Sequence, residues 1–239
     1  MNTEVADGVT VVRIDNPPVN AFDQDLVDDA VATVCGIEGP IVLTGAGKCF
    51  SAGVDLRAII EGPLEYTDRF LAAVSAAFLA VFDHPAPVVA AVNGHAIAGG
   101  CVLAMAADVR LMSTGLIGLT EVAVGVPFPV AALEICGYAM GPSVTRAVLQ
   151  ADNIDVLAAA ERGWIDEVVA PDELLTRAVD TARSLGRHPA TGYAAMKHQL
   201  HRHARAAIDA GAELDANVRA IWKSDETRGR IAAFLDALK

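Results

Sequence analysis

Residues 87–101 read PVVAAVNGHAIAGGC, a run of small and β-branched residues followed by a turn and a pair of glycines. Pro87–Val92 predicts a buried strand whose proline takes the first position, where a missing amide does least harm. The turn at Asn93-Gly94-His95 is followed by Gly99–Ala107, which has a helical composition, and Val109–Met112 is strand-like again. This alternation of strands and helices predicts an α/β fold with parallel strands.

The same alternation continues toward the N-terminus. Thr3–Ile14 predicts a β-hairpin that turns at Asp7-Gly8. Apolar residues recur at helical spacing after Asp23 and stop before Gly36, so this segment predicts a helix. Ile41–Thr44 predicts a short buried strand, and the glycines after it predict a loop.

The last third of the chain has a different character. Strand signals vanish after Asp172, and Ser224 is predicted to cap a final helix with an apolar face made of Ile231, Phe234, Leu235 and Leu238. We therefore predict an α/β core over residues 1–185 and a helical C-terminal region over residues 186–239.

Composition limits the partners and the location of the chain. The net charge of −12 argues against nucleic acid or an anionic membrane as a partner, because both attract basic surfaces. Although 53% of the 239 residues are hydrophobic, no apolar run is long enough to cross a bilayer. The N-terminus lacks the pattern of a secretion signal, so we expect a cytoplasmic protein.

Motifs for metals and nucleotide cofactors are not supported. Gly45-Ala46-Gly47-Lys48 resembles a phosphate loop, but Val42 stands where its first glycine is required and Cys49 where a Ser or Thr should bind the metal. The four cysteines lie far apart and are interpreted as reduced packing residues. His198, His201 and His203 are interpreted as a solvated or interface face of a helix. We predict no metal and no separate cofactor.

Two glycine-containing stretches are candidates for binding chemistry. Phe50–Arg57 reads FSAGVDLR, and Asn93–Cys101 reads NGHAIAGGC. Glycine lets a ligand approach the backbone closely, and free amides at a helix start favour negative charge. Each stretch taken alone is better interpreted as a tight turn in a packed α/β domain.

Taken together and in order, these stretches closely resemble the crotonase (enoyl-CoA hydratase/isomerase) superfamily. Matching segments extend over nearly the whole chain and comprise residues 16–22, 43–57, 92–108, 118–127 and 159–169. The resemblance implies a ββα spiral core, an acyl-CoA thioester substrate that carries its own CoA, and a homotrimer or hexamer with the C-terminal helices at the interface. It also implies an oxyanion hole formed by the backbone amides of Val54 and Gly99.

The resemblance further bears on the reaction. Hydratases of the superfamily use two glutamates, but here Val102 takes the position of the first, and only the second is retained, as Glu121. Pro127 comes one residue early and is followed by Phe128, where the hydratases have a glycine-rich segment. A single carboxylate favours an isomerase that shifts a double bond. The alternatives are a hydratase or another lyase or hydrolase of the superfamily, and an acyl-CoA binding protein without catalysis.

Four further residues are assigned to substrate binding on the same resemblance, and two of them have another interpretation. They are Ala52, Asp55, Arg57 and Phe128. Asp55 is also expected to cap the helix that follows it, and Arg57 is either a neighbour of the CoA phosphates or an exposed helix charge. Without the resemblance, Glu121 would be interpreted as a solvated acid at a loop or strand end.

Overall fold

The computed structural model describes residues 1–237, and its centre is a six-stranded sheet. An antiparallel hairpin forms one edge, and the other neighbouring strands are parallel. The order of the strands is β1 (Asn2–Ala6), β2 (Val9–Ile14), β3 (Ile41–Gly45), β5 (Val88–Val92), β7 (Val109–Met112) and β10 (Glu167–Val168). The central strands β3 and β5 are buried on both faces, which explains their continuous apolar sequence.

A second, smaller sheet lies beyond the ends of these strands. It contains β4 (Cys49–Ser51), β6 (His95–Ile97), β8 (Leu116–Gly118) and β9 (Ile154–Asp155). β4, β6 and β8 each follow a strand of the large sheet after a short turn. The loop predicted after Ile41–Thr44 and the turn predicted at Asn93-Gly94-His95 are present, but each leads directly into a short strand, β4 or β6, that the sequence analysis did not predict. Strands of three residues beside glycines carry almost no periodic signal. The repeated strand–strand–helix units agree with the expected spiral α/β core.

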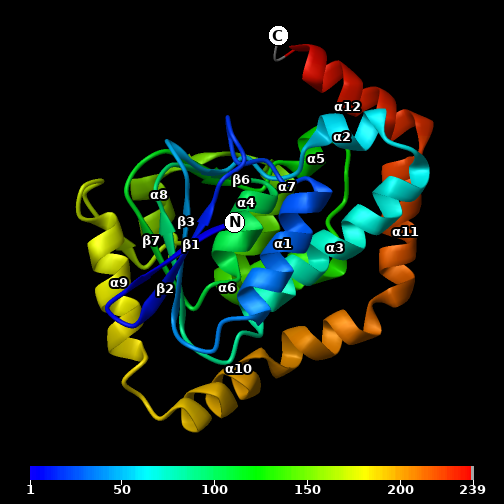
Figure 1. Ribbon diagram of the computed structural model, residues 1–239. Coiled ribbons are helices and arrows are strands. Elements are labelled where there is room, and N and C mark those ends of the chain that lie inside the picture. The colour runs from blue at the N-terminus through cyan, green and yellow to red at the C-terminus, as the bar shows by residue number, and fades with distance from the viewer. Residues whose placement is uncertain (238–239) are drawn as a thin grey trace.

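Helices cover both faces of the large sheet (Figure 1). One face packs on α9 (Leu174–Leu185), and the other faces a larger core to which many helices contribute, among them four that supply many of its buried side chains. These are α1 (Gln24–Cys35), α3 (Leu64–Phe82), α4 (Gly99–Met105) and α6 (Val130–Met140). Alternate residues of β5 point to opposite faces, as the pleat requires: Ala90 joins the four-helix side and Val89 the α9 side.

Several shorter helices connect these layers. They are α2 (Leu56–Glu61), α5 (Glu121–Val124), the 3₁₀ turn Gly141–Ser143, α7 (Val144–Gln150) and α8 (Val156–Glu161). Two of them begin at an aspartate whose carboxylate accepts backbone N–H groups, Asp55 before α2 and Asp155 before α8. Each such cap satisfies amides that have no partner within the helix.

The C-terminal helices form an arm that runs around the core and returns to its upper end (Figure 1). The C-terminal arm consists of α10 (Ala190–Ala210), α11 (Ala212–Lys223) and α12 (Asp225–Ala237). Along its length it packs in turn on α6, α3 and α2. Ser224 caps α12 through its Oγ, which accepts the N–H of Thr227 at 3.2 Å, as predicted. Leu238, assigned to the apolar face of this helix, lies outside the described residues.

One interpretation of the arm is wrong. His201 does not lie on a solvated face, because its side chain is buried and its ring stacks on Phe82 with the centroids 3.6 Å apart. Burial lowers the pKa of His201 to about 4, so the ring packs as a neutral group. His198 and His203 are exposed. Within residues 1–237, none of the helices combines the length and the apolar character needed to span a membrane.

Candidate active site

The backbone amides of Val54 and Gly99 lie at the point where the loop after β4 meets the start of α4. Gly53 has φ +84, and a Cβ added there would lie only 2.8 Å from the nitrogen of Gly99, so the two segments are in direct backbone contact. Among residues 1–237, neither the N–H of Val54 nor that of Gly99 donates a hydrogen bond. We refer to residues 51–54 and 98–100 as the amide corner.

Hydrogen bonds from the segment Asn16–Phe22 hold the amide corner in place. The Asn20 side chain donates to the carbonyl of Cys49 at 2.7 Å, and the Ser51 hydroxyl donates to the carbonyl of Asn20 at 2.7 Å. The Ser51 oxygen also accepts the N–H of Gly53 at 3.1 Å. The N–H of Phe22 donates to the carbonyl of Gly53 at 2.7 Å. The early turn that matched the superfamily therefore fixes the backbone that carries Val54.

The start of α4 is strained and tightly packed. Ala98 has φ 54 and ψ −124, a backbone conformation that residues other than glycine rarely adopt. Its N–H donates to the carbonyl of Gly118 at 2.8 Å. A Cβ on Gly100 would lie 2.2 Å from the carbonyl oxygen of Ser51. Strain of this kind persists only where the surroundings over-determine the backbone.

A cavity of about 130 Å³ separates the amide corner from Glu121. Glu121 is the only residue with an ionisable side chain among the described residues that line this cavity. The lining includes the predicted site residues Ala52, Val54, Gly99, Glu121 and Phe128, and it also includes Val102. Apart from Glu121, Thr120, the indole N–H of Trp222 and the backbone, the walls are apolar, so a charge in the cavity is poorly solvated.

Glu121 begins the short helix α5 and has an unusual environment. Its Oε2 is buried without a hydrogen-bond partner among the described residues, although the residue as a whole is only partly buried. Burial raises the pKa of Glu121 from 4.5 to about 8, and the backbone amides of Glu121 and Thr120 oppose this only in part. We refer to residues 120–129, which carry this carboxyl group, as the acid wall.

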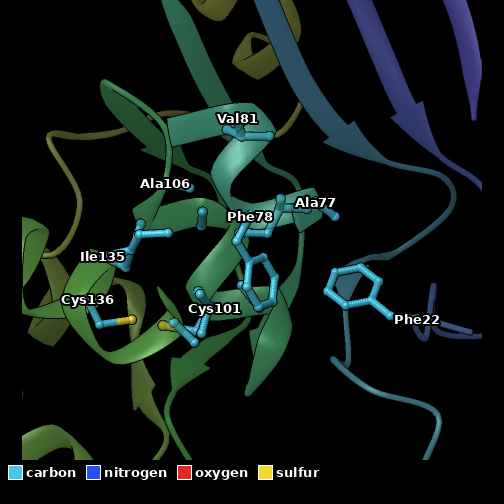
Figure 2. Close-up of a cluster of buried hydrophobic side chains, with 14 of the residues drawn as sticks. Phe22, Ala77, Phe78, Val81, Cys101, Ala106, Ile135 and Cys136 are labelled. Atoms are coloured by element: carbon cyan, nitrogen blue, oxygen red, sulfur yellow. The ribbon is translucent and has the colours of Figure 1, made fainter. Parts of the chain in front are cut away.

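Two buried thiols stand behind the acid wall. Figure 2 shows the side chains of Cys101 on α4 and Cys136 on α6 directed toward each other in the core. Burial raises the pKa of both thiols, and the Glu121 carboxyl contributes in the same direction. Both cysteines are therefore neutral packing residues, as the sequence predicted for the cysteines in general. In the same view Phe22 approaches Phe78 edge to face, with ring centroids 6.3 Å apart.

Two of the predicted substrate-binding residues lie outside the cavity lining. The carboxylate of Asp55 accepts the N–H groups of Arg57 at 2.9 Å and Ala58 at 3.2 Å, so it serves as the expected helix cap. Arg57 is exposed on α2. Contact of either residue with the CoA part of a substrate stays a prediction.

The sequence analysis missed the contribution of the C-terminal arm. Trp222 on α11 and Phe234 on α12 line the cavity, together with Phe78 and Leu71 from α3. Trp222 is buried, and its indole N–H donates to the carbonyl of Pro127 in the acid wall at 2.8 Å. The only sequence signal was a tryptophan on an amphipathic helix, which does not say where the helix packs.

Within the described residues, no group of three or more His, Cys, Asp or Glu side chains is arranged to hold a metal ion. The chemistry available in the cavity consists of two free amide donors and one carboxyl group with a raised pKa. Such a pair suits a proton transfer next to a carbonyl oxygen, because the donors stabilise the negative charge that the base creates.

Known proteins share this architecture. Residues 4–239 match the protein family described as enoyl-CoA hydratase/isomerase. A probable enoyl-CoA hydratase of Mycobacterium tuberculosis is 27% identical over 95% of this chain and 91% of its own length. A probable enoyl-CoA hydratase of Rhizobium meliloti is 31% identical over 82% of this chain and 77% of its own length. Human mitochondrial delta3-delta2-enoyl-CoA isomerase shares the fold with a TM-score of 0.94 at 22% identity, covering 99% of this chain and 97% of that chain.

Proposed function

The chain belongs to the enoyl-CoA hydratase/isomerase, or crotonase, family, and from this premise we propose that it is an isomerase that shifts the double bond of an enoyl-CoA. The observation that carries the proposal is the single carboxyl group in the cavity. Glu121 faces two free amides, and buried Val102 occupies the position where the family's hydratases have their first glutamate. One carboxylate suffices to move one proton between two carbons.

The proposed reaction proceeds through an enolate. The Glu121 carboxylate removes a proton from the carbon next to the thioester carbonyl, and the electrons of that C–H bond move onto the carbonyl oxygen. The N–H groups of Val54 and Gly99 donate to this oxygen and stabilise its charge. Collapse of the enolate places the double bond between the α and β carbons, while Glu121 returns the proton to the γ carbon.

The raised pKa of Glu121 suits this role. A carboxylate with a pKa of about 8 is a much stronger base than an ordinary glutamate, and its protonated form is still acidic enough to give the proton back. The apolar walls support the same reaction, because they leave water few polar groups to bind. All the hydrogen in the scheme moves as a proton, so the scheme needs no redox cofactor.

Hydration is the second candidate, since the two curated relatives are named as probable hydratases. Addition of water needs a group that positions the water and one that supplies its proton. Glu121 would have to fill both roles, because the side chain of Val102 beside it has no polar atom. We therefore favour isomerisation.

The test uses 3-hexenoyl-CoA and 2-hexenoyl-CoA with the wild type and Glu121→Gln. We expect the wild type to convert the 3-enoyl to the 2-enoyl compound without forming 3-hydroxyhexanoyl-CoA. Glu121→Gln should lower kcat by about 1,000-fold, within the range for loss of a general base, and should still bind hexanoyl-CoA.

Other outcomes separate the alternatives. Formation of the 3-hydroxy product would identify a hydratase, and tight binding without turnover by the wild type would identify a binding protein. Exchange of substrate α protons with D₂O is a simpler first measurement. Equal exchange by the wild type and Glu121→Gln would exclude the role proposed for this residue.

A further inference from the structure

The C-terminal arm closes the acyl cavity with a wall of aromatic side chains. Trp222 is only 3% exposed, whereas Phe234 is 41% exposed, so the tryptophan forms an inner wall and the phenylalanine stands at the rim. Phe78 from α3 contributes a third ring, with 3% exposure. A substrate chain that outgrows the cavity therefore has to displace a large ring.

Several polar contacts hold the Trp222 wall in position. Its indole N–H is bonded to the carbonyl of Pro127, which ties the ring to the acid wall itself. The next residue, Lys223, makes an ion pair of 2.8 Å with Asp68 on α3. On α12, the guanidinium of Arg228 donates to the carbonyl of Ile59 on α2 at 2.9 Å. These contacts anchor both helices of the wall on the core.

The size of the cavity limits what it can hold. An engineered protein cavity of roughly 150 Å³ accommodates benzene, which has six carbon atoms. The cavity of about 130 Å³ is slightly smaller, and it must also hold the thioester carbonyl. We propose that this protein selects short acyl groups of about four to six carbons, and that Trp222 is the residue that sets the limit. The inference rests on the proposed function, in that it places the acyl group in this cavity.

Binding of saturated acyl-CoA compounds tests the inference without turnover. In an open apolar channel, affinity rises about fourfold for each CH₂ group that is buried. For the wild type we expect the affinity measured by calorimetry to rise from butanoyl-CoA to hexanoyl-CoA. Dodecanoyl-CoA should then bind at least about tenfold more weakly than hexanoyl-CoA, because its chain lacks space at the anchored wall.

Substitution of Trp222 by a smaller residue should raise the limit on acyl chain length. In Trp222→Ala, dodecanoyl-CoA should bind at least about tenfold more tightly than in the wild type, while butanoyl-CoA changes by less than about threefold. Trp222→Leu removes less volume and serves if the alanine variant does not fold, as judged by circular dichroism. Trp164→Leu is the matched control, since Trp164 is equally buried and its indole N–H is bonded to Ser143, but it does not line the cavity.

The outcomes distinguish the two proposals. A wild type that binds dodecanoyl-CoA as tightly as hexanoyl-CoA, or Trp222 variants that keep the limit, would overturn the chain-length inference while leaving isomerisation intact. A clear limit without isomerisation of 3-hexenoyl-CoA would overturn only the proposed reaction. Failure to bind any of these compounds would overturn both.

Discussion

The amide corner and the acid wall face each other across one cavity, yet they are built in opposite ways. The amide corner is dense in hydrogen bonds, and backbone segments meet there so closely that Gly53 and Gly100 leave no space for a Cβ. The acid wall holds its carboxyl group among apolar side chains, with Oε2 unpartnered within the described residues. One region is held rigidly by hydrogen bonds and leaves only the two amides of Val54 and Gly99 free to bind a ligand. The other region is poorly solvated.

The difference follows from what each half has to do. Backbone donors stabilise a developing oxyanion only if they are already in place when the charge forms, which requires a rigid backbone. A carboxylate becomes a stronger base when burial destabilises its charged form, and hydrogen bonds to the carboxylate would cancel that gain. Substitutions in the amide corner should therefore lower activity by moving the amide donors. Substitutions in the acid wall should lower it by changing the protonation of the carboxyl group.

After the loss already expected for Glu121→Gln in the acid wall, the largest effect that follows from this comparison is at the amide corner, in Gly53→Ala. The added methyl group would meet the Gly99 nitrogen at 2.8 Å and the Ile97 carbonyl oxygen at 2.9 Å, so the two donor segments must separate. We expect kcat for 3-hexenoyl-CoA to fall about 100-fold, as when one oxyanion donor is lost. The pH dependence of the remaining activity should not change, because no titratable group is altered.

Gly47→Ala is the matched control for this prediction. Gly47 also has a positive φ, of +68, but nothing lies within 4 Å of an added Cβ. Both variants lose about 1 to 2 kcal/mol of stability through the left-handed backbone, whereas only Gly53→Ala should lose activity. A folded Gly53→Ala enzyme with the kcat of the wild type would show that the corner does not bind the reacting oxygen.

The pH dependence of kcat/KM in the wild type tests the role of the acid wall. Catalysis needs the ionised form of Glu121, and its pKa of about 8 means that this form appears only as the pH rises. We expect kcat/KM to increase about tenfold per pH unit below pH 8 and then to level off, so that at pH 7 it is about a tenth of the plateau. A profile that is flat between pH 6 and pH 9 would contradict the assignment of Glu121 as the base.

The two halves of the site also differed in how far the sequence could reveal them. Val54, Gly99 and Glu121 were predicted from the resemblance of their segments to the superfamily, and all three line one cavity. Gly99 and Glu121 each begin a helix, and Val54 lies in the loop between β4 and α2. The strands β2, β3, β5 and β7 and the helix α1 were predictable from the sequence, because their apolar patterns are local. The roles of Val54, Gly99 and Glu121 in catalysis remain proposals.

Features set by tertiary packing were not predictable in this way. Trp222 reaches the cavity only because the 21-residue helix α10 carries the chain around the core, and no local pattern encodes that path. His201 was misinterpreted because its neighbour in space, Phe82, is more than 100 positions away in the sequence. The pKa of Glu121 likewise depends on residues from several distant segments that together exclude water.

The smallest effect expected is on stability, and it separates the wall from the corner without any substrate. Because the pKa of Glu121 is higher in the folded protein than in the unfolded chain, the folded state holds its proton more tightly between pH 4.5 and pH 8. Stability from this group is therefore fully present below pH 4.5 and is lost as the pH rises toward 8. In Glu121→Gln this loss is absent. The difference in free energy of unfolding between the variant and the wild type should therefore shift by about 1 to 2 kcal/mol in favour of the variant between pH 5 and pH 8, with allowance for solvent screening of a partly buried residue.

Urea unfolding at pH 5 and at pH 8 measures this shift. The control for loss of a carboxylate is Glu61→Gln, because Glu61 is an exposed glutamate on α2. Parallel stability curves for the wild type and Glu121→Gln would mean that the carboxylate is well solvated, and the contrast between the rigid corner and the poorly solvated wall would then have to be abandoned.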